Sequence, residues 1–265
     1  MLDIFAAIGA LVFLGCTWRL GMRLAGLDGT ALAGLVGLLA GVGGATFFER
    51  RGFTLGPSRP TSTFQGLLMP GLMLLVLAAA VFPPSWLAAS AKGPGAMTAP
   101  LLVAVAGGLL IGAIASATGF CTVGWLKRSV FFGERRLLFG LVAFVLGAFV
   151  VKAVGGKLWP GFSGAPIAHA DHLWNFLGMV LAGLAFTLAG GCPGRQLVAA
   201  GEGSADAGVF VMGSMVGVAL AHNLAMAAGP DKGDVLGGPG PWGMAAVIAG
   251  ILFCAGVGLW MKNGD

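Results

Sequence analysis

Three cysteines in this chain stand next to glycines inside otherwise apolar stretches. The stretches read Gly15-Cys16-Thr17-Trp18-Arg19, Gly119-Phe120-Cys121-Thr122-Val123-Gly124 and Gly190-Gly191-Cys192-Pro193-Gly194-Arg195. Glycine and proline interrupt helices, and proline is tolerated at the first helical position, so we expect a new helix to start at Pro193 with Cys192 as its N-cap. A thiol there faces unpaired N–H groups and the positive end of the helix dipole, and both favour the thiolate.

Thiols and arginines at helix breaks indicate a path for an anion. Positive helix ends and an arginine select negative charge, and sulfur is a soft, polarizable contact. A row of such groups can pass along a small sulfur- or selenium-bearing anion with weak binding at each step, either non-covalently or by transient S–S or S–Se exchange. The candidate pathway residues are Cys16, Cys121, Cys192, Arg19, Arg195, Arg128 and His222.

Each candidate also has a structural interpretation. Most buried cysteines are small apolar packing residues, which is what we expect of Cys254. Arg19 and Arg195 can instead snorkel to the membrane interface, and His222 with Asn223 can form an interhelical hydrogen bond. His169 and His172 have the setting of loop residues. The cysteine spacing suits neither a zinc site nor a Cys-x-x-Cys pair, so we predict no metal, no cofactor and no catalytic residue.

The elements that must position these residues are transmembrane helices. Of the 265 residues, 57% are hydrophobic and only 9% are charged, whereas a soluble domain carries about 25% charge. This composition predicts an all-α, polytopic membrane bundle formed as a single domain over residues 1–265. The 48 glycines favour close helix–helix contact in lipid, and the net charge of +5 is attributed to loops rather than to nucleic-acid binding.

Apolar runs near the ~20 residues that a membrane span needs predict eight spans. The first starts at Ile4 and has only 15 uncharged residues before Arg19, too few for a ~30 Å hydrocarbon core, so it should break near Cys16 inside the membrane. The other spans are Gly29–Phe48, Phe64–Leu87, Met97–Thr118, Leu137–Val154, His172–Ala189, Ala207–Ala228 and Trp242–Trp260.

If successive spans cross the membrane in opposite directions, the charged loop residues separate onto its two sides. One side holds only Lys92, Lys152, Lys157 and Lys232, and the other holds Arg50, Arg51, Arg59, Lys127, Arg128, Arg135, Arg136, Arg195 and Lys262. The second side is therefore predicted to be cytoplasmic, with the C-terminus on it, in a cell (inner) membrane. The helices broken at Cys16 and Cys192 then run in opposite directions, which predicts an inverted repeat with halves near 1–92 and 93–265.

The three cysteine motifs resemble those of the YedE/YeeE membrane family. The first motif, with the Leu24-Ala25-Gly26-Leu27-Asp28 that follows it, is most similar to the selenium-associated YedE branch. This resemblance implies re-entrant helices near the membrane middle, a path lined by Cys16, Cys121 and Cys192, and a cytoplasmic TusA-like sulfur-carrier partner. Many relatives begin with further apolar segments, whereas this chain opens almost at the first cysteine motif.

Other functions remain open at this point. Thiosulfate is the alternative substrate for a transporter of this kind. A membrane thiol oxidoreductase would form a disulfide between two motif cysteines and exchange electrons with quinone, although the absence of Cys-x-x-Cys counts against it. A passive scaffold would leave thiols and arginines at membrane depth unexplained. Because no acidic residue falls inside the predicted spans, channel-like or facilitated passage is expected.

Overall fold

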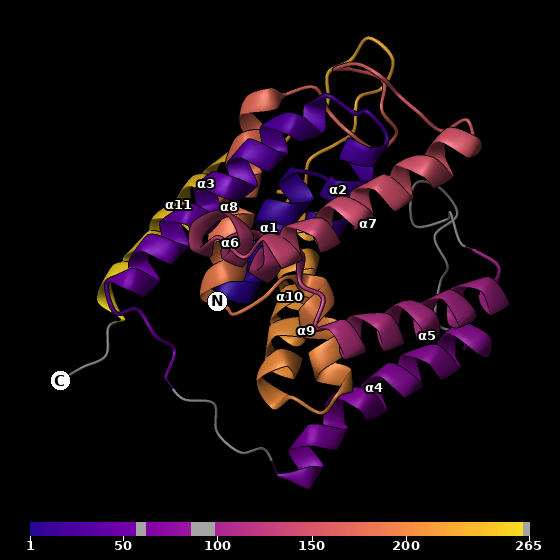
Figure 1. Ribbon diagram of the computed structural model, residues 1–265, viewed down its shortest axis with the longest axis vertical. Coiled ribbons are helices and arrows are strands. Elements are labelled where there is room, and N and C mark those ends of the chain that lie inside the picture. Colours follow the sequence, from indigo (N-terminus) through magenta and orange to yellow (C-terminus); the bar gives the residue numbers. More distant parts are fainter. Residues whose placement is uncertain (57–61, 86–98, 262–265) are drawn as a thin grey trace. The chain divides into compact units, whose positions relative to one another are not determined.

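The computed structural model describes residues 1–56, 62–85 and 99–261, and the regular structure of these residues is helical (Figure 1). Eight helical segments among them are long and apolar enough to cross a membrane. The predicted polytopic bundle is confirmed. The helices are α1 (Leu2–Val12), α2 (Thr17–Ala25), α3 (Thr30–Arg50), α4 (Thr63–Val81), α5 (Leu101–Thr118), α6 (Thr122–Phe132), α7 (Arg135–Val154), α8 (His172–Leu188), α9 (Pro193–Gly201), α10 (Ala205–Asn223) and α11 (Pro241–Trp260).

The chain divides into two compact units. The first unit consists of Met1–Pro57, Cys121–Pro193 and Phe210–Asp265, and the second of Ser58–Phe120 and Gly194–Val209. The first unit thus contains α1–α3, α6–α8, most of α10 and α11. In the second unit, the Ser116 hydroxyl on α5 donates to a carboxylate oxygen of Glu202 at 2.5 Å, which ties α5 to the end of α9.

The core of the first unit is built on α8, which packs against α1, α3 and α11. Figure 1 shows α3, α8 and α11 running side by side. A Cβ atom at Gly183 would lie 2.7 Å from the carbonyl oxygen of Leu38, and one at Gly9 would lie 2.6 Å from that of Gly178. The backbones approach this closely because no side chain separates them, so the abundant glycine does serve helix–helix contact.

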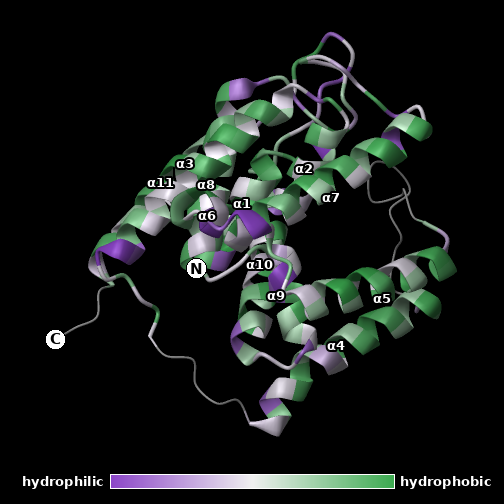
Figure 2. Cartoon of the chain, viewed as in Figure 1, coloured by the Kyte–Doolittle hydropathy of each residue, from purple (hydrophilic) through white to green (hydrophobic). Residues whose placement is uncertain are grey.

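α7 lies at the opposite extreme of burial, since none of its residues is buried in the structure. It is apolar on all sides apart from its ends, as the green ribbon in Figure 2 shows. A helix that is apolar all round and yet exposed is suited to hydrocarbon rather than to water. We therefore assign the outer surface of α7 in the first unit to the lipid.

The loops of the first unit gather into two groups. At one end, the backbone N–H of Gly29 donates to the carbonyl oxygen of Gly161 at 2.6 Å, and that of Asp231 donates to Ala168 at 2.8 Å. These bonds join the loops that follow α2, α7 and α10. At the other end, the segment after α3 is hydrogen-bonded to the end of α11. This grouping agrees with the predicted alternation of the spans.

The span boundaries differ from prediction mainly at one helix. We expected a span over Ala207–Ala228, but α10 ends at Asn223 because Ala225 adopts a left-handed backbone with φ of 51°. His222 therefore lies in the last turn of α10 and is exposed, not in the middle of a span. Five positions used in the sequence predictions lie outside the described residues: Arg59, Leu87, Lys92, Met97 and Lys262.

Candidate functional site

Each of the three motif cysteines stands immediately before the first residue of a helix. Cys16 precedes α2, Cys121 precedes α6 and Cys192 precedes α9. The predicted break near Cys16 and the predicted helix start at Pro193 are both confirmed. In all three cases the residue two positions before the cysteine has a left-handed backbone, so the three breaks share one local geometry. These residues are Leu14, Gly119 and Gly190, with φ of 60°, 61° and 87°.

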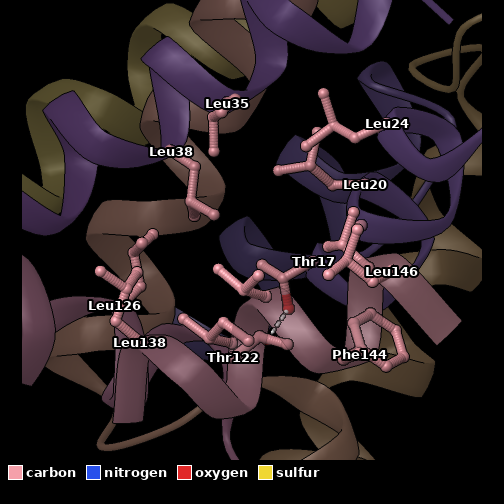
Figure 3. Close-up of a pocket in the computed structure, with 14 residues that line it drawn as sticks. Thr17, Leu20, Leu24, Leu35, Leu38, Thr122, Leu126, Leu138, Phe144 and Leu146 are labelled. Carbon is pink, nitrogen blue, oxygen red and sulfur yellow. Dashed lines mark hydrogen bonds between the residues drawn. The ribbon is translucent and has the colours of Figure 1, made fainter. Parts of the chain in front are cut away.

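The starts of α2 and α6 meet inside the first unit. The side-chain oxygens of Thr17 and Thr122, the first residue of each helix, are 2.5 Å apart and buried. Figure 3 shows this hydrogen bond between the two side chains. Because each threonine follows a motif cysteine directly, the bond fixes the break at Cys16 against the break at Cys121.

A second contact joins the break at Cys121 to the break at Cys192. The Sγ atom of Cys121 accepts hydrogen bonds from the backbone N–H of Cys192 at 3.4 Å and from that of Gly124 at 3.3 Å. Cys121 and Cys192 are buried, whereas Cys16 is partly exposed, and all are free thiols. The structure thus links the three motif cysteines in the order Cys16, Cys121, Cys192. Cys254 lies fully buried in the apolar core, as predicted.

Arg19 lies one turn along α2 from Cys16. Its guanidinium donates to the carbonyl oxygens of Pro166 at 3.3 Å and Ile167 at 3.2 Å. Among the described residues no carboxylate lies within ion-pair distance of it, and its Nε is buried without a hydrogen-bond acceptor there. Arg19 therefore keeps a positive charge close to the first thiol.

Arg23, on the next turn of α2, takes part in a buried network instead. Its Nε donates to Asp28 at 2.7 Å, one Nη donates to the carbonyl oxygen of Phe13 at 2.8 Å, and the other donates to the Thr30 hydroxyl at 2.6 Å. Asp28 also accepts from the backbone N–H of Thr30 at 2.9 Å. This network ties the end of α1 to the start of α3, so it fixes the two ends of the segment that holds Cys16.

His169 was expected to be a loop residue, and it is, but it is completely buried. Its Nε2 lies 2.8 Å from the carbonyl oxygen of Val12, and its own carbonyl oxygen accepts from the Asn175 amide at 2.8 Å. Removal from water lowers the pKa of His169 below its usual value, and the bond to Val12 opposes this only in part. The neutral ring thus satisfies one of the last carbonyl groups of α1 beside the break.

Three candidates remain, namely Arg128, His222 and Arg195. Arg128 lies near the far end of α6, where its exposed side chain pairs with Glu134 at 2.8 Å. His222 is exposed at the end of α10. Arg195 stands one turn along α9 from Cys192 and, in the second unit, lies 3.5 Å from Glu202. Within the first unit, the structure therefore groups the three motif cysteines and Arg19.

The sequence reasoning missed the polar residues that hold this group together, namely Thr17, Thr122, Asp28, Thr30 and His169. Two local signals were present in the sequence. A threonine follows two of the motif cysteines, and Asp28 stands two residues before Thr30 at the start of a predicted span, a spacing at which an aspartate side chain can accept from the backbone in an Asx turn. The burial of His169 had no such signal, because it depends on a carbonyl group 157 residues away.

A pocket of about 270 Å³ borders the two threonines in the first unit (Figure 3). Its walls come from α2, α3, α6 and α7, and apart from Thr17 and Thr122 they are apolar. The pocket thus has a long hydrocarbon lining and one polar end next to the helix breaks.

No family model matches this sequence, and comparisons with curated proteins and with solved structures give no match.

Proposed function

We propose that this protein is a membrane transporter that passes a small sulfur- or selenium-containing anion along Cys16, Cys121 and Cys192. The observation that carries the proposal is the linkage of the three helix breaks, through the bond between Thr17 and Thr122 and the bond from the Cys192 backbone to the Cys121 thiol. Interrupted helices are tolerated at membrane depth where they are buried in protein or line a cavity, and we propose that these three linked breaks line a route for a solute.

The chemistry of the breaks supports an anion as that solute. Starts of helices present backbone N–H groups and a positive partial charge, and Arg19 adds a full charge that no described carboxylate neutralises. Asp28 is buried nearby, but it is occupied by Arg23 and Thr30. Thiols add soft, weak contacts, which favour rapid transfer from one group to the next.

The proposal extends to the substrate, family and partner suggested by the motif resemblance. A reduced selenium species is the proposed substrate, with thiosulfate as the alternative. We propose membership of the YedE/YeeE family, delivery to a TusA-like sulfur carrier, and a location in the inner membrane with the C-terminus in the cytoplasm. We propose facilitated passage, in which consumption of the substrate inside the cell maintains the gradient. A path that contains the charge of Arg19 fits this mode of transport.

Flux into liposomes tests this proposal directly. The purified protein would be reconstituted into liposomes, and the uptake of radiolabelled thiosulfate added outside would be measured alone and in competition with selenosulfate. We expect Cys121→Ala and Cys192→Ala to lower the initial rate at least about tenfold. Cys254→Ala is the matched control, because it removes a buried thiol outside the row and should leave the rate unchanged. Full transport by the Cys16/Cys121/Cys192 triple alanine variant would exclude the proposed path.

The contact between Cys121 and Cys192 also favours a second candidate, a membrane thiol oxidoreductase. In that reaction the two thiols would form one disulfide and release two protons and two electrons to a quinone. Mass mapping of alkylated thiols, before and after addition of a soluble quinone, separates the two functions. When the protein is unfolded for alkylation, a transporter yields both Cys121 and Cys192 as alkylated thiols throughout, whereas the oxidoreductase yields a disulfide-linked peptide.

A further inference from the structure

The pocket beside Thr17 and Thr122 has one wall on α7, and several residues of that wall are exposed. Leu138, Val142 and Leu146, which line it from α7, are themselves 43%, 44% and 56% exposed. Because α7 has no buried residue, its surface faces hydrocarbon in a membrane. An apolar pocket with a wall on this helix is accessible to the acyl chains of lipids.

Two arginines precede the pocket-lining residues of α7 in the sequence. Arg135 and Arg136 are the first residues of α7, about one helical turn before the pocket residue Leu138, and both are exposed. The nearby carboxylates are already paired, since Glu134 binds Arg128 at 2.8 Å and Glu49 binds Lys127 at 2.8 Å. In the described parts of the chain no acidic residue lies within ion-pair distance of Arg135 or Arg136.

We infer that an anionic phospholipid binds at this place. Its phosphate lies on Arg135 and Arg136, and one acyl chain enters the pocket along Leu138 and Val142 toward Thr17. The lipid comes from the leaflet at the N-terminal end of α7. Positive charge next to an apolar pocket matches a molecule that carries a negative head and a hydrocarbon tail, and each cation near the membrane surface strengthens the attraction to an anionic head. The inference does not depend on the proposed transport.

Native mass spectrometry of protein released from nanodiscs tests the inference. The nanodiscs would contain equal amounts of phosphatidylglycerol and phosphatidylcholine, and bound lipids would be counted by mass. We expect the wild-type protein to retain phosphatidylglycerol in preference, and Arg135→Gln/Arg136→Gln to reduce this preference about tenfold. Lys152→Gln, which removes a charge at the other end of α7, is the matched control and should leave it unchanged.

A second variant tests the tail. Val142→Phe narrows the pocket and should reduce retention of both lipids, while leaving the preference between the heads intact. Excess inorganic phosphate should not displace the lipid, because phosphate cannot fill the apolar pocket. An unchanged lipid preference in the double arginine variant, unchanged retention in Val142→Phe, or displacement by phosphate would each overturn the inference. The double arginine variant changes only exposed side chains, so it should fold even if Val142→Phe does not.

Discussion

The Sγ atom of Cys121 accepts a hydrogen bond from the backbone N–H of Cys192, a residue 71 positions away, at 3.4 Å. The bond joins the starts of two helices that each follow a left-handed turn. It places the thiol of one cysteine against the backbone of another, inside segments of the chain that are suited to a membrane. The accessibility of the thiols, the threonine pair and the buried charges near the breaks can each be tested.

The motif thiols should react with a membrane-permeant maleimide in a fixed order. Cys16 is partly exposed, whereas Cys121, Cys192 and Cys254 are 7%, 0% and 0% exposed. Alkylation needs both access and room for the reagent, so we expect Cys16 to be labelled first and Cys192 and Cys254 last. Peptide mass mapping over time measures the order. Labelling of Cys254 before Cys16 would contradict the burial described here.

The hydrogen bond between Thr17 and Thr122 should stabilise the junction of α2 and α6. Thr17→Val removes one partner and leaves the Thr122 hydroxyl buried without it, so the single variant should unfold more easily. Replacing both threonines by valine removes the unsatisfied group, and we expect a coupling of about 1 kcal/mol in the double-mutant cycle. Unfolding in mixed micelles measures it. A coupling of zero would mean that the two hydroxyls do not support each other.

The buried pair of Arg23 and Asp28 should matter far more for stability than the exposed pair of Arg128 and Glu134. Arg23→Leu strands a buried carboxylate and frees the carbonyl oxygen of Phe13, so we expect a loss of about 3–5 kcal/mol. Arg128→Gln breaks an exposed pair and should change stability by less than about 1 kcal/mol. Thermal unfolding in detergent compares the two variants. Equal losses would show that burial does not govern these pairs.

The sequence was sufficient to predict the membrane bundle, because the length of an apolar run can be read without knowing which residues meet in the folded protein. Gly190 and Pro193 marked a helix break, and the low charge of the chain marked the spans. The end of α10 could not be predicted, because Ala225 adopts a left-handed backbone that its residue type does not indicate. The exposed position of His222 follows from that turn.

The sequence predicted the cysteines of the site but not the residues that hold them in place. The types of Cys16, Cys121 and Cys192 and their glycine neighbours indicated the breaks, but no local pattern showed that the Thr17 and Thr122 side chains meet, since these residues are 105 positions apart. Arg19 and Arg23 lie one helical turn apart on α2. Arg19 donates to loop carbonyl oxygens, whereas Arg23 is buried beside a carboxylate. Only the tertiary arrangement distinguishes them.

Stability should fall as the pH drops below the usual pKa of histidine, because His169 is held neutral. Burial lowers its pKa in the folded state, so below about pH 6.5 the unfolded chain takes up a proton that the folded protein resists. The loss should begin there and continue until the folded pKa is passed.

The free energy of unfolding, measured from pH 8 to pH 5, gives the slope of stability against pH. His169→Gln keeps a donor for the carbonyl oxygen of Val12 but cannot titrate, so it should flatten this slope. His222→Gln is the control, since His222 is exposed. If the slope survives in His169→Gln and disappears in His222→Gln, the pH dependence belongs to the end of α10 and not to the end of α1.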